Sequence, residues 1–279
     1  MKKKVMLFAA MVGVTAASSG QAATIFGVDG LNNLVTFDSA APSTFTSSVR
    51  ITGIADSVQG IDFRPLNGVL YALGGDRVIY TINTANGAAT ALGGPLAIEG
   101  TLFGFDFNPV ADAIRIVSNT NQNYRASPNT GALLGTDTNV FYSGSMQDPD
   151  ITANAYVSGS TTQFAIDTAA DTLVNQANNL GTLTTVGSLG VDVGPRTSFD
   201  IVGPDAFVFN NRTLYRADLE TGGLTSLGRT TDDLFGIAIG LQGAVPEPAS
   251  WAMMIIGFGA VGTALRRGKG KAAGKVSFA

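Results

Sequence analysis

The central part of the chain repeats a short pattern in which apolar residues alternate with small or polar residues. The segment GIDFRP (60–65) recurs as GFDFNP (104–109), and looser copies follow as TANAYV from Thr152, SFDIVG from Ser198 and GIAIG from Gly236. The copies start 44, 48, 46 and 38 residues apart. Alternation with a period of two is typical of a half-buried β-strand, so each repeat is predicted to contain one such strand.

A second marker recurs at similar intervals. The segment INTANGAATALG (82–93) matches ADLETGGLTSLG (217–228) without a gap, and looser copies are ASPNTGALLG from Ala126, IDTAADTLV from Ile166 and FDSAAP from Phe37. An Asx or Ser side chain that accepts from nearby amides, followed by a glycine with positive φ, predicts a turn between two strands. This Asx or Ser position occurs five times, at Asp38, Asn83, Ser127, Asp167 and Asp218.

Four short strands per unit of about 40 residues, repeated around an axis, describe a β-propeller. The strand at Gly236 comes too late to begin its own blade, whereas residues 24–42 supply outer strands without an inner one. We therefore expect an all-β fold, a β-propeller of about five blades, closed by strands shared between the two chain ends. The unit from Thr152 is the least regular, because its second marker follows unusually soon.

Both chain ends lie outside this repeat pattern. Residues 1–23 contain three lysines, an apolar run from Val5 to Val14 and then small residues, which predicts a signal peptide cut after Ala22 or Ala23. The apolar run is too short to favour a retained transmembrane helix. The expected domains are a signal peptide (1–23), the repeat domain (24–240), a linker (241–248), a transmembrane helix (249–265) and a basic cytoplasmic tail (266–279).

The C-terminal segment VPEPASWAMMIIGFGAVGTALRR (245–267) resembles the PEP-CTERM sorting signal in its PEPxxWA variant. Its mainly apolar segment of 17 residues (249–265) would form a helix of about 26 Å, near the minimum for crossing a bilayer, with the basic end in the cytoplasm. The resemblance implies that this is a bacterial protein held transiently in the inner membrane by its tail, and that an exosortase processes this tail. The alternative is a membrane anchor that is never cut. The residues that carry the resemblance are Pro246, Glu247, Pro248, Trp251, Ala252, Arg266 and Arg267.

A second resemblance covers the repeat domain. The segment GFDFNPVADAIRIVSNTNQNYRASPNTGALL (104–134) resembles a bacterial domain-of-unknown-function family of secreted, propeller-like repeat proteins. That family supports the repeat fold and implies no activity.

Composition narrows the chemistry further. Between residues 24 and 240 nine arginines stand against 20 acidic residues, a balance of −11, which disfavours nucleic acid and anionic lipid as partners. The chain has neither cysteine nor histidine. This excludes disulfides, a thiol nucleophile, the usual zinc sites and a Ser-His-Asp triad.

Aspartates recur within the first marker. Asp62, Asp106 and Asp200 occupy one repeat position, where Asn154 replaces the carboxylate and Ala238 ends the series. One interpretation is that these side chains line a central channel and hold a cation. The other is that they accept hydrogen bonds from backbone amides. Repeat proteins use one residue type for one structural task in every repeat, which favours the second interpretation.

Other polar clusters offer weaker candidates. The loop NTNQNYR, with Asn119, Asn121 and Asn123, is the best loop candidate for contact with a polar ligand. Acidic pairs such as Asp148 with Asp150 lack the calcium-loop spacing, so no metal site and no cofactor are predicted, with calcium kept as an alternative.

Together these patterns predict a non-enzymatic protein exported to the cell surface or extracellular matrix, which binds or structures extracellular polymer, with extracellular polysaccharide as a candidate partner. Its expected processing partners are signal peptidase and exosortase. A secreted glycan hydrolase is one alternative, although Glu99 and Glu220 are the only glutamates of the repeat domain. A calcium-dependent adhesion module is the other.

Overall fold

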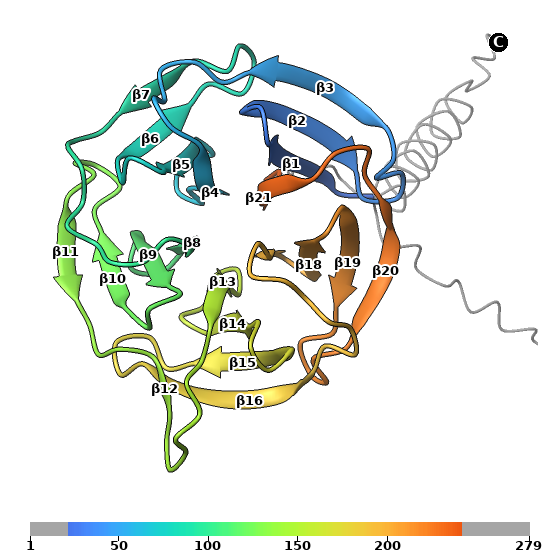
Figure 1. Cartoon of the computed structure of the whole chain (residues 1–279). Coiled ribbons are helices and arrows are strands. Elements are labelled where there is room, and N and C mark those ends of the chain that lie inside the picture. Colours follow the sequence, from blue (N-terminus) through green and yellow to red (C-terminus); the bar gives the residue numbers. More distant parts are fainter. Residues whose placement is uncertain (1–21, 242–279) are drawn as a thin grey trace, which may run out of the picture. The chain divides into compact units, whose positions relative to one another are not determined.

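Five sheets stand around a common axis in the computed structural model, and each forms one blade of a β-propeller (Figure 1). The structure describes residues 22–241. The expected signal-peptide body, the Pro-Glu-Pro motif, the transmembrane helix and the basic tail lie outside these residues. The prediction of an all-β propeller with five blades is confirmed.

Within each blade the strands follow one another from the axis outward. Blade 1 contains β21 (Leu234–Ile239), β1 (Thr24–Asp29), β2 (Asn33–Asp38) and β3 (Phe45–Arg50). Blade 2 contains β4 (Val58–Phe63), β5 (Leu70–Gly74), β6 (Ile79–Ile82) and β7 (Ala89–Ala91). Blade 3 contains β8 (Phe103–Asn108), β9 (Ala113–Ser118), β10 (Asn123–Ala126) and β11 (Leu133–Thr136).

Blade 4 is the one sheet with five strands among the described residues. It contains β13 (Ile151–Tyr156), β14 (Gln163–Asp167), β15 (Thr172–Gln176), β16 (Thr182–Ser188) and, at its outer edge, β12 (Phe141–Tyr142), which pairs parallel with β16. Blade 5 contains β17 (Ser198–Val202), β18 (Asp205–Asn210), β19 (Thr213–Ala217) and β20 (Leu224–Arg229).

All five copies of the first sequence marker form the strands nearest the axis, β4, β8, β13, β17 and β21. Chain closure also follows the prediction. The last strand, β21, pairs antiparallel with the first, β1, so that Ile239 lies opposite Ile25 and Ile237 opposite Gly27. The two ends of the domain thus complete blade 1 together, which joins the ring without a covalent link.

The second marker forms the turn before the outermost strand in blades 1, 2, 3 and 5. Its Asx or Ser side chain accepts from an amide two residues on, as Asp218 does from Glu220 at 2.8 Å. The same hydrogen bond forms at Asp38, Asn83 and Ser127.

In blade 4 the predicted Asx turn at Asp167 also forms, because Asp167 accepts from the Ala169 amide at 3.0 Å, but it connects β14 to β15, one strand earlier than in the other blades. The turn before the outer strand β16 begins at Ala177 instead. There the backbone bonds between Ala177 and Thr182 and between Gly181 and Ala177 keep the turn without an Asx side chain.

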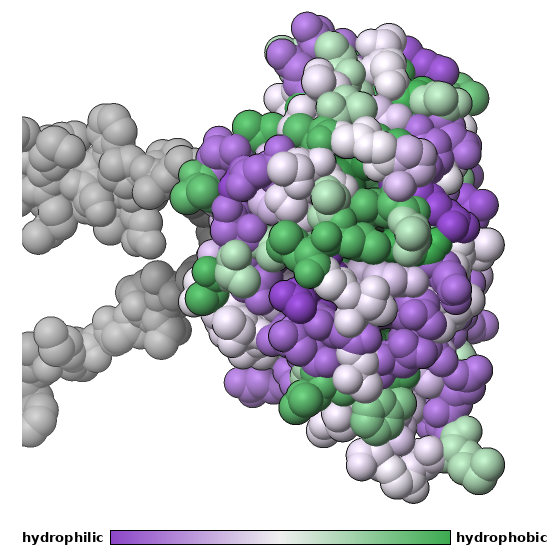
Figure 2. Space-filling model, turned by 90° about the vertical axis from the view of Figure 1, so that its left-hand side faces the viewer, coloured by the Kyte–Doolittle hydropathy of each residue, from purple (hydrophilic) through white to green (hydrophobic). Residues whose placement is uncertain are grey.

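The apolar core is divided into clusters that lie mainly between neighbouring blades. The cluster between blades 3 and 4 is the smallest, with Val117, Val140, Ile151, Ala165, Val174 and Leu183. Polar side chains around Arg115 fill much of the remaining space at this interface. On the side view in Figure 2, hydrophilic residues cover much of the surface and hydrophobic residues gather in separate areas. Within residues 22–241 no helix has the length and apolar character needed to cross a membrane.

Candidate functional site

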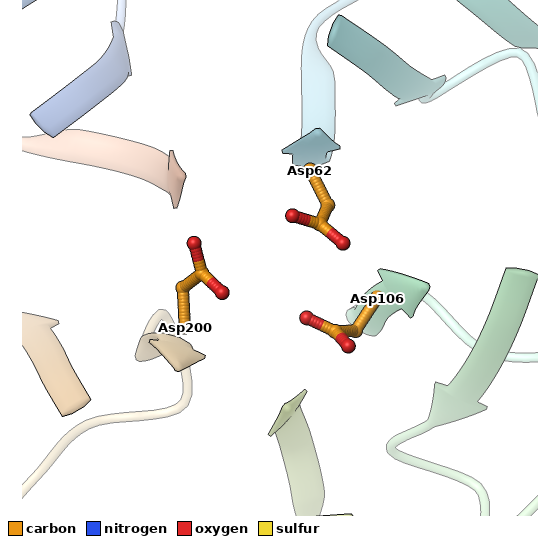
Figure 3. A group of neighbouring side chains, drawn as sticks. All are labelled: Asp62, Asp106 and Asp200. Atoms are coloured by element: carbon orange, nitrogen blue, oxygen red, sulfur yellow. The ribbon is translucent and has the colours of Figure 1, made fainter. Parts of the chain in front are cut away.

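Three aspartates from three blades meet at the propeller axis. Asp62 on β4, Asp106 on β8 and Asp200 on β17 point toward one another (Figure 3), and one carboxylate oxygen of each lies within 4.8 Å of the other two. All three side chains are buried. The sequence repeat placed them at one position of the inner strand, and the fold turns that shared position into a ring.

Each carboxylate also joins its blade to the next one. The Phe107 amide donates to Asp62 at 2.8 Å, the Tyr156 amide to Asp106 at 2.9 Å, and the Ile239 amide to Asp200 at 2.5 Å. The interpretation favoured from the sequence, hydrogen bonding to backbone amides, is therefore confirmed. Because a carboxylate oxygen has two lone pairs, these bonds leave acceptor capacity that faces the axis.

The two units without an aspartate behave differently. Ala238 offers no acceptor. Asn154 is 1% exposed, and neither its Oδ1 nor its Nδ2 has a hydrogen-bond partner. A register shift in β13 between Ile151 and Ala153 precedes Asn154. Its amide lies against the backbone of β8, where Oδ1 would be only 2.2 Å from a Cβ atom at Gly104.

This amide lines a small axial cavity of about 20 Å³. Inner-strand residues from every blade surround it, mostly two positions before the aspartates, and they include Gly60, Gly104, Ser198 and Gly236. The hydroxyls of Thr152 and Ser198, which also line the cavity, are buried without partners. A cavity of this size holds one water molecule or one bare ion, and its walls offer oxygen atoms.

The ring is electrostatically unusual because no cationic side chain bonds to it among the described residues. Burial, followed by repulsion from neighbouring carboxylates, raises the pKa of Asp62 and Asp106 well above the usual value. Burial also raises the pKa of Asp200 to about 6, against the effect of the Ile239 and Ile201 amides. The carboxyl groups of Asp62 and Asp106 are in hydrogen-bonding contact, which requires a shared proton or a cation between them.

A second site lies between blades 3 and 4, where a pocket of about 520 Å³ opens. Its volume is in the range of small-molecule sites. Turns from both blades form its walls together with six strand residues, Asn108, Ala113, Ile114, Arg115, Arg125 and Tyr156. The residues with polar side chains are Asn108, Arg115, Arg125, Tyr156, Thr161, Asn178 and Asn179.

Arg115, on β9, organises this pocket although it is only 2% exposed. Its guanidinium donates to Asp137 and Asn123, each at 2.7 Å, and to Asn179 at 2.8 Å. The Tyr156 hydroxyl accepts from Arg115 at 3.2 Å and donates to Asn178 at 2.6 Å. The network thereby fixes two asparagine side chains and a tyrosine at the pocket wall.

Arg125 completes the network from the pocket rim. It donates to Asp137 through Nε at 2.8 Å and through a terminal nitrogen at 3.0 Å. Although burial pushes the pKa of Asp137 upward, the bonds from Arg125 and Arg115 hold it below its usual value. Two guanidinium groups thus share one carboxylate at the pocket.

The three asparagines of the NTNQNYR loop contact different neighbours. Asn119 accepts from the amides of Thr101 and Leu102, and Asn121 donates to Asp148 at 2.6 Å. Asn123 is fully buried and belongs to the Arg115 network behind the pocket. The structure does not bring these three side chains together at one surface.

Sequence reasoning missed Arg115, Arg125, Tyr156, Asn178 and Asn179 as a group. One signal was present, because Arg115 interrupts the apolar strand AIRIV, where a charged residue is expected only with a buried partner. The asparagines come from the degenerate turn of blade 4. Nothing in their local sequence indicates that this turn faces blade 3.

Of the predicted processing residues, Ala22 and Ala23 are described. Ala23 is buried, its amide donates to Ser39 Oγ at 2.9 Å, and its carbonyl accepts from the Ser39 amide at 2.9 Å. Its backbone is therefore part of the domain. The residues of the C-terminal motif, Pro246, Glu247, Pro248, Trp251, Ala252, Arg266 and Arg267, lie outside the described residues.

The fold and these sites define a five-bladed propeller with a polar axis and an open pocket between blades 3 and 4. Residues 33–238 match the family described as Domain of unknown function (DUF4394), and the chain belongs to this family. Residues 244–268 match the PEP-CTERM protein-sorting motif. This match, as the sequence predicted, marks an exported bacterial protein that is processed by an exosortase at the membrane.

No curated protein matches the chain. Among solved structures, it is similar to a chain in the crystal structure of a nidogen/laminin complex, with 12% identity, a TM-score of 0.47, and coverage of 79% of this chain and 85% of that chain. It is also similar to a structural genomics protein of unknown function from Bacteroides thetaiotaomicron, with 13% identity, a TM-score of 0.48, and coverage of 73% and 55%, respectively.

Proposed function

We propose that the propeller is a non-enzymatic binding module, displayed at the cell surface or in the extracellular matrix, that holds extracellular polysaccharide in the pocket between blades 3 and 4. The observation that carries the proposal is the polar wall of this pocket. Asn179 and Arg125 present amide and guanidinium groups, which suit the hydroxyl groups of a sugar, and the Tyr156 and Asn178 side chains, bonded to each other, complete the wall. The sorting motif supports an extracellular location, where such a polymer is found.

The positions of the carboxylates argue against hydrolysis. A glycosidase needs a pair of carboxyl groups, one of them with a raised pKa, on either side of the sugar. Among residues 22–241 the aspartates with raised pKa are buried at the propeller axis, where a sugar ring cannot reach them. The pocket that is large enough has no carboxylate in its wall, and the nearby Asp137 is held ionised by two arginines.

Co-sedimentation tests the proposal. The full chain would be mixed with protein-free polysaccharide prepared from the medium of the producing bacterium, and the bound fraction would be measured. Arg125→Ala is expected to weaken binding at least tenfold. Arg216→Ala is the matched control, because Arg216 forms a similar half-exposed ion pair with Asp205 on blade 5.

The asparagine amides offer a second variant, Asn179→Ala, which is expected to weaken binding in the same way. Equal binding by the parent, both pocket variants and the control would contradict a polysaccharide site between blades 3 and 4. Release of reducing sugar ends on prolonged incubation would contradict the non-enzymatic part of the proposal.

A further inference from the structure

We propose that the pocket between blades 3 and 4 binds acidic polysaccharide, and that Arg125 and Asn179 hold the carboxylate of a uronate residue of the polymer. This inference rests on the proposed function and names the class of polymer that the same pocket takes.

The charges at the pocket favour an anionic ligand. The guanidinium groups of Arg115 and Arg125 line the pocket, and no carboxylate does. Both groups bond to a single carboxylate, Asp137, which leaves one positive charge in excess. Asp112, in the turn between β8 and β9 that forms part of the wall, is already paired with Arg64 of blade 2. The excess charge therefore has no partner among these groups, and a carboxylate on the ligand would balance it.

The acceptors of the pocket wall are largely in use. The Asn178 Oδ1 atom accepts from the Tyr156 hydroxyl at 2.6 Å, and the Asn179 Oδ1 atom accepts from Arg115 at 2.8 Å. The Asn108 Oδ1 atom accepts from two main-chain amides. Four main-chain carbonyls of the wall also accept hydrogen bonds, those of Thr161, Ala177, Asn178 and Asn179.

Two donors of the wall remain available. Arg125 uses Nε and Nη2 to bond Asp137, and its Nη1 has no partner among residues 22–241. The Nδ2 group of Asn179 has none there either, because the bond from Arg115 uses the oxygen of this side chain. The Arg125 side chain is 35% exposed, so a ligand can reach it. Since a guanidinium presents several N–H groups in one plane, it can bond a second carboxylate along a free edge.

A sugar ring also finds apolar surface in this pocket. Ala111, Ala177 and Leu180 line it beside the polar groups, and Leu180 is exposed. Small-molecule sites commonly combine such apolar walls with a few polar groups that fix the orientation of the ligand. The pocket therefore offers contacts for the ring of a uronate as well as for its carboxylate.

The acidic character of the whole domain does not oppose this binding. Nine arginines stand against 20 acidic residues between residues 24 and 240, but exposed charges more than about 8 Å away are largely screened at physiological salt. Nucleic acid needs contacts to many phosphates, whereas a uronate needs one local positive charge.

The test compares one polymer in two forms. Polysaccharide from the medium of the producing bacterium would be divided, and the carboxyl groups of one portion would be reduced to alcohols, which preserves chain length and linkages. Co-sedimentation with the full chain in detergent measures binding. The parent is expected to bind the untreated polymer at least about tenfold more tightly than the reduced polymer, because only the untreated form balances the charge at Arg125.

Two variants locate the preference at the pocket. Arg125→Gln removes the charge but keeps an amide donor, so it should bind both forms equally. Asn179→Asp keeps an oxygen acceptor for Arg115 and adds a negative charge, so it should weaken binding of the untreated polymer much more than binding of the reduced polymer. Arg216→Gln is the matched control and should keep the preference of the parent, since Arg216 forms a similar ion pair on blade 5.

Equal binding of both forms by the parent would overturn the uronate assignment and leave the polysaccharide proposal standing, whereas binding of neither form would overturn both. A preference that persists unchanged in Arg125→Gln would place acid recognition outside this pocket and overturn the inference. A preference that is lost after mild alkali and mild acid, which remove ester-linked and ketal-linked acids but leave uronates in the chain, would also overturn it.

Discussion

The Oδ2 atom of Asp200 accepts a hydrogen bond of 2.5 Å from the main-chain amide of Ile239. Asp200 lies on the inner strand of blade 5, and Ile239 ends the strand that closes blade 1 against β1. One side chain therefore connects the last complete blade to the strand that seals the ring. Its other oxygen accepts from the Ile201 amide at 2.6 Å.

Replacing Asp200 by alanine should weaken the contact between blade 5 and the strand β21 that closes the ring. Asp200→Ala leaves the Ile201 and Ile239 amides without their acceptor, and we expect a loss of about 2–5 kcal/mol in the free energy of unfolding. Urea unfolding in EDTA measures the loss. Asp205→Ala, which removes a partly exposed ion pair with Arg216 in the same blade, should cost less than about 1 kcal/mol. Equal losses in the two variants would contradict the closing role of Asp200.

The carboxylate ring predicts how stability depends on pH when no metal is present. The folded pKa of Asp200 is raised from 3.8 to about 6, and those of Asp62 and Asp106 are raised as well. The folded state therefore holds these protons more tightly than the unfolded state. The resulting stabilisation is complete below about pH 3.8 and is lost as pH rises through the folded values; for Asp200 alone the loss is about 3 kcal/mol.

Melting temperatures in EDTA between pH 4 and 8 measure this effect. The decrease on raising the pH should be smaller in Asp106→Asn, which has one fewer acid in the ring. Superimposable curves for the parent and Asp106→Asn would contradict the assignment of the decrease to the ring.

The second sequence marker contains a glycine that is needed both for a positive φ and for close packing. Gly87 has a φ of 73°, and a Cβ atom there would lie 2.1 Å from the carbonyl oxygen of Arg50, which ends β3 where the linker from blade 1 to blade 2 begins. Gly68 has a similar φ of 69°, but a Cβ atom there would have no neighbour within 4 Å.

Gly68→Ala should therefore show the cost of the backbone conformation alone, about 1 kcal/mol. Gly87→Ala should cost at least about 2 kcal/mol more, because the linker backbone must move. The free energy of unfolding of both variants measures the difference. If the two substitutions cost the same, the close approach of the linker is not a constraint on the fold.

The repeats predicted the architecture because each copy encodes the same local structure. The alternation in GIDFRP and GFDFNP indicated the inner strands, and the spacing of copies indicated five blades and the shared closure. At Asp167 the predicted Asx turn forms, but between β14 and β15; the outer turn of blade 4 is made by backbone bonds without an Asx residue, so the repeat pattern did not indicate it.

The candidate sites were predictable only in part. The shared repeat position of Asp62, Asp106 and Asp200 indicated that they would converge, since radial symmetry brings equivalent positions to the axis. The pocket around Arg115 and Asn179 joins side chains 64 residues apart from two blades. No local pattern encodes which non-equivalent residues of neighbouring blades face each other.

The start of the exported domain also affects stability. Ala23 is 2% exposed and forms two hydrogen bonds with Ser39. A chain that begins at Ala23 should therefore be more stable than one that begins at Thr24 by about 1–3 kcal/mol. Urea unfolding of the two forms measures this difference. Indistinguishable midpoints would mean that the Ala23–Ser39 pairing adds nothing to the edge of β1.

The sorting motif gives a prediction about location. Replacing Pro246, Glu247 and Pro248 by alanines removes the extended Pro-Glu-Pro segment that an exosortase processes, so the full-length tail should remain in the membrane. Intact mass, measured separately for membrane, cell-surface and medium fractions, should show a parent species that ends near Pro246 and a variant that retains Arg266 and Arg267.

The matched control replaces Leu241, Gln242 and Gly243, which lie just upstream in the linker, by alanines. It should be processed like the parent, because it keeps the length of the linker and leaves the motif intact. Equal release of the Pro-Glu-Pro variant and this control would show that the tail is removed without reading the motif. An uncut tail in the parent itself would make the segment after Ala249 a permanent anchor, and the search for a ligand would then move from free polymer to material close to the membrane.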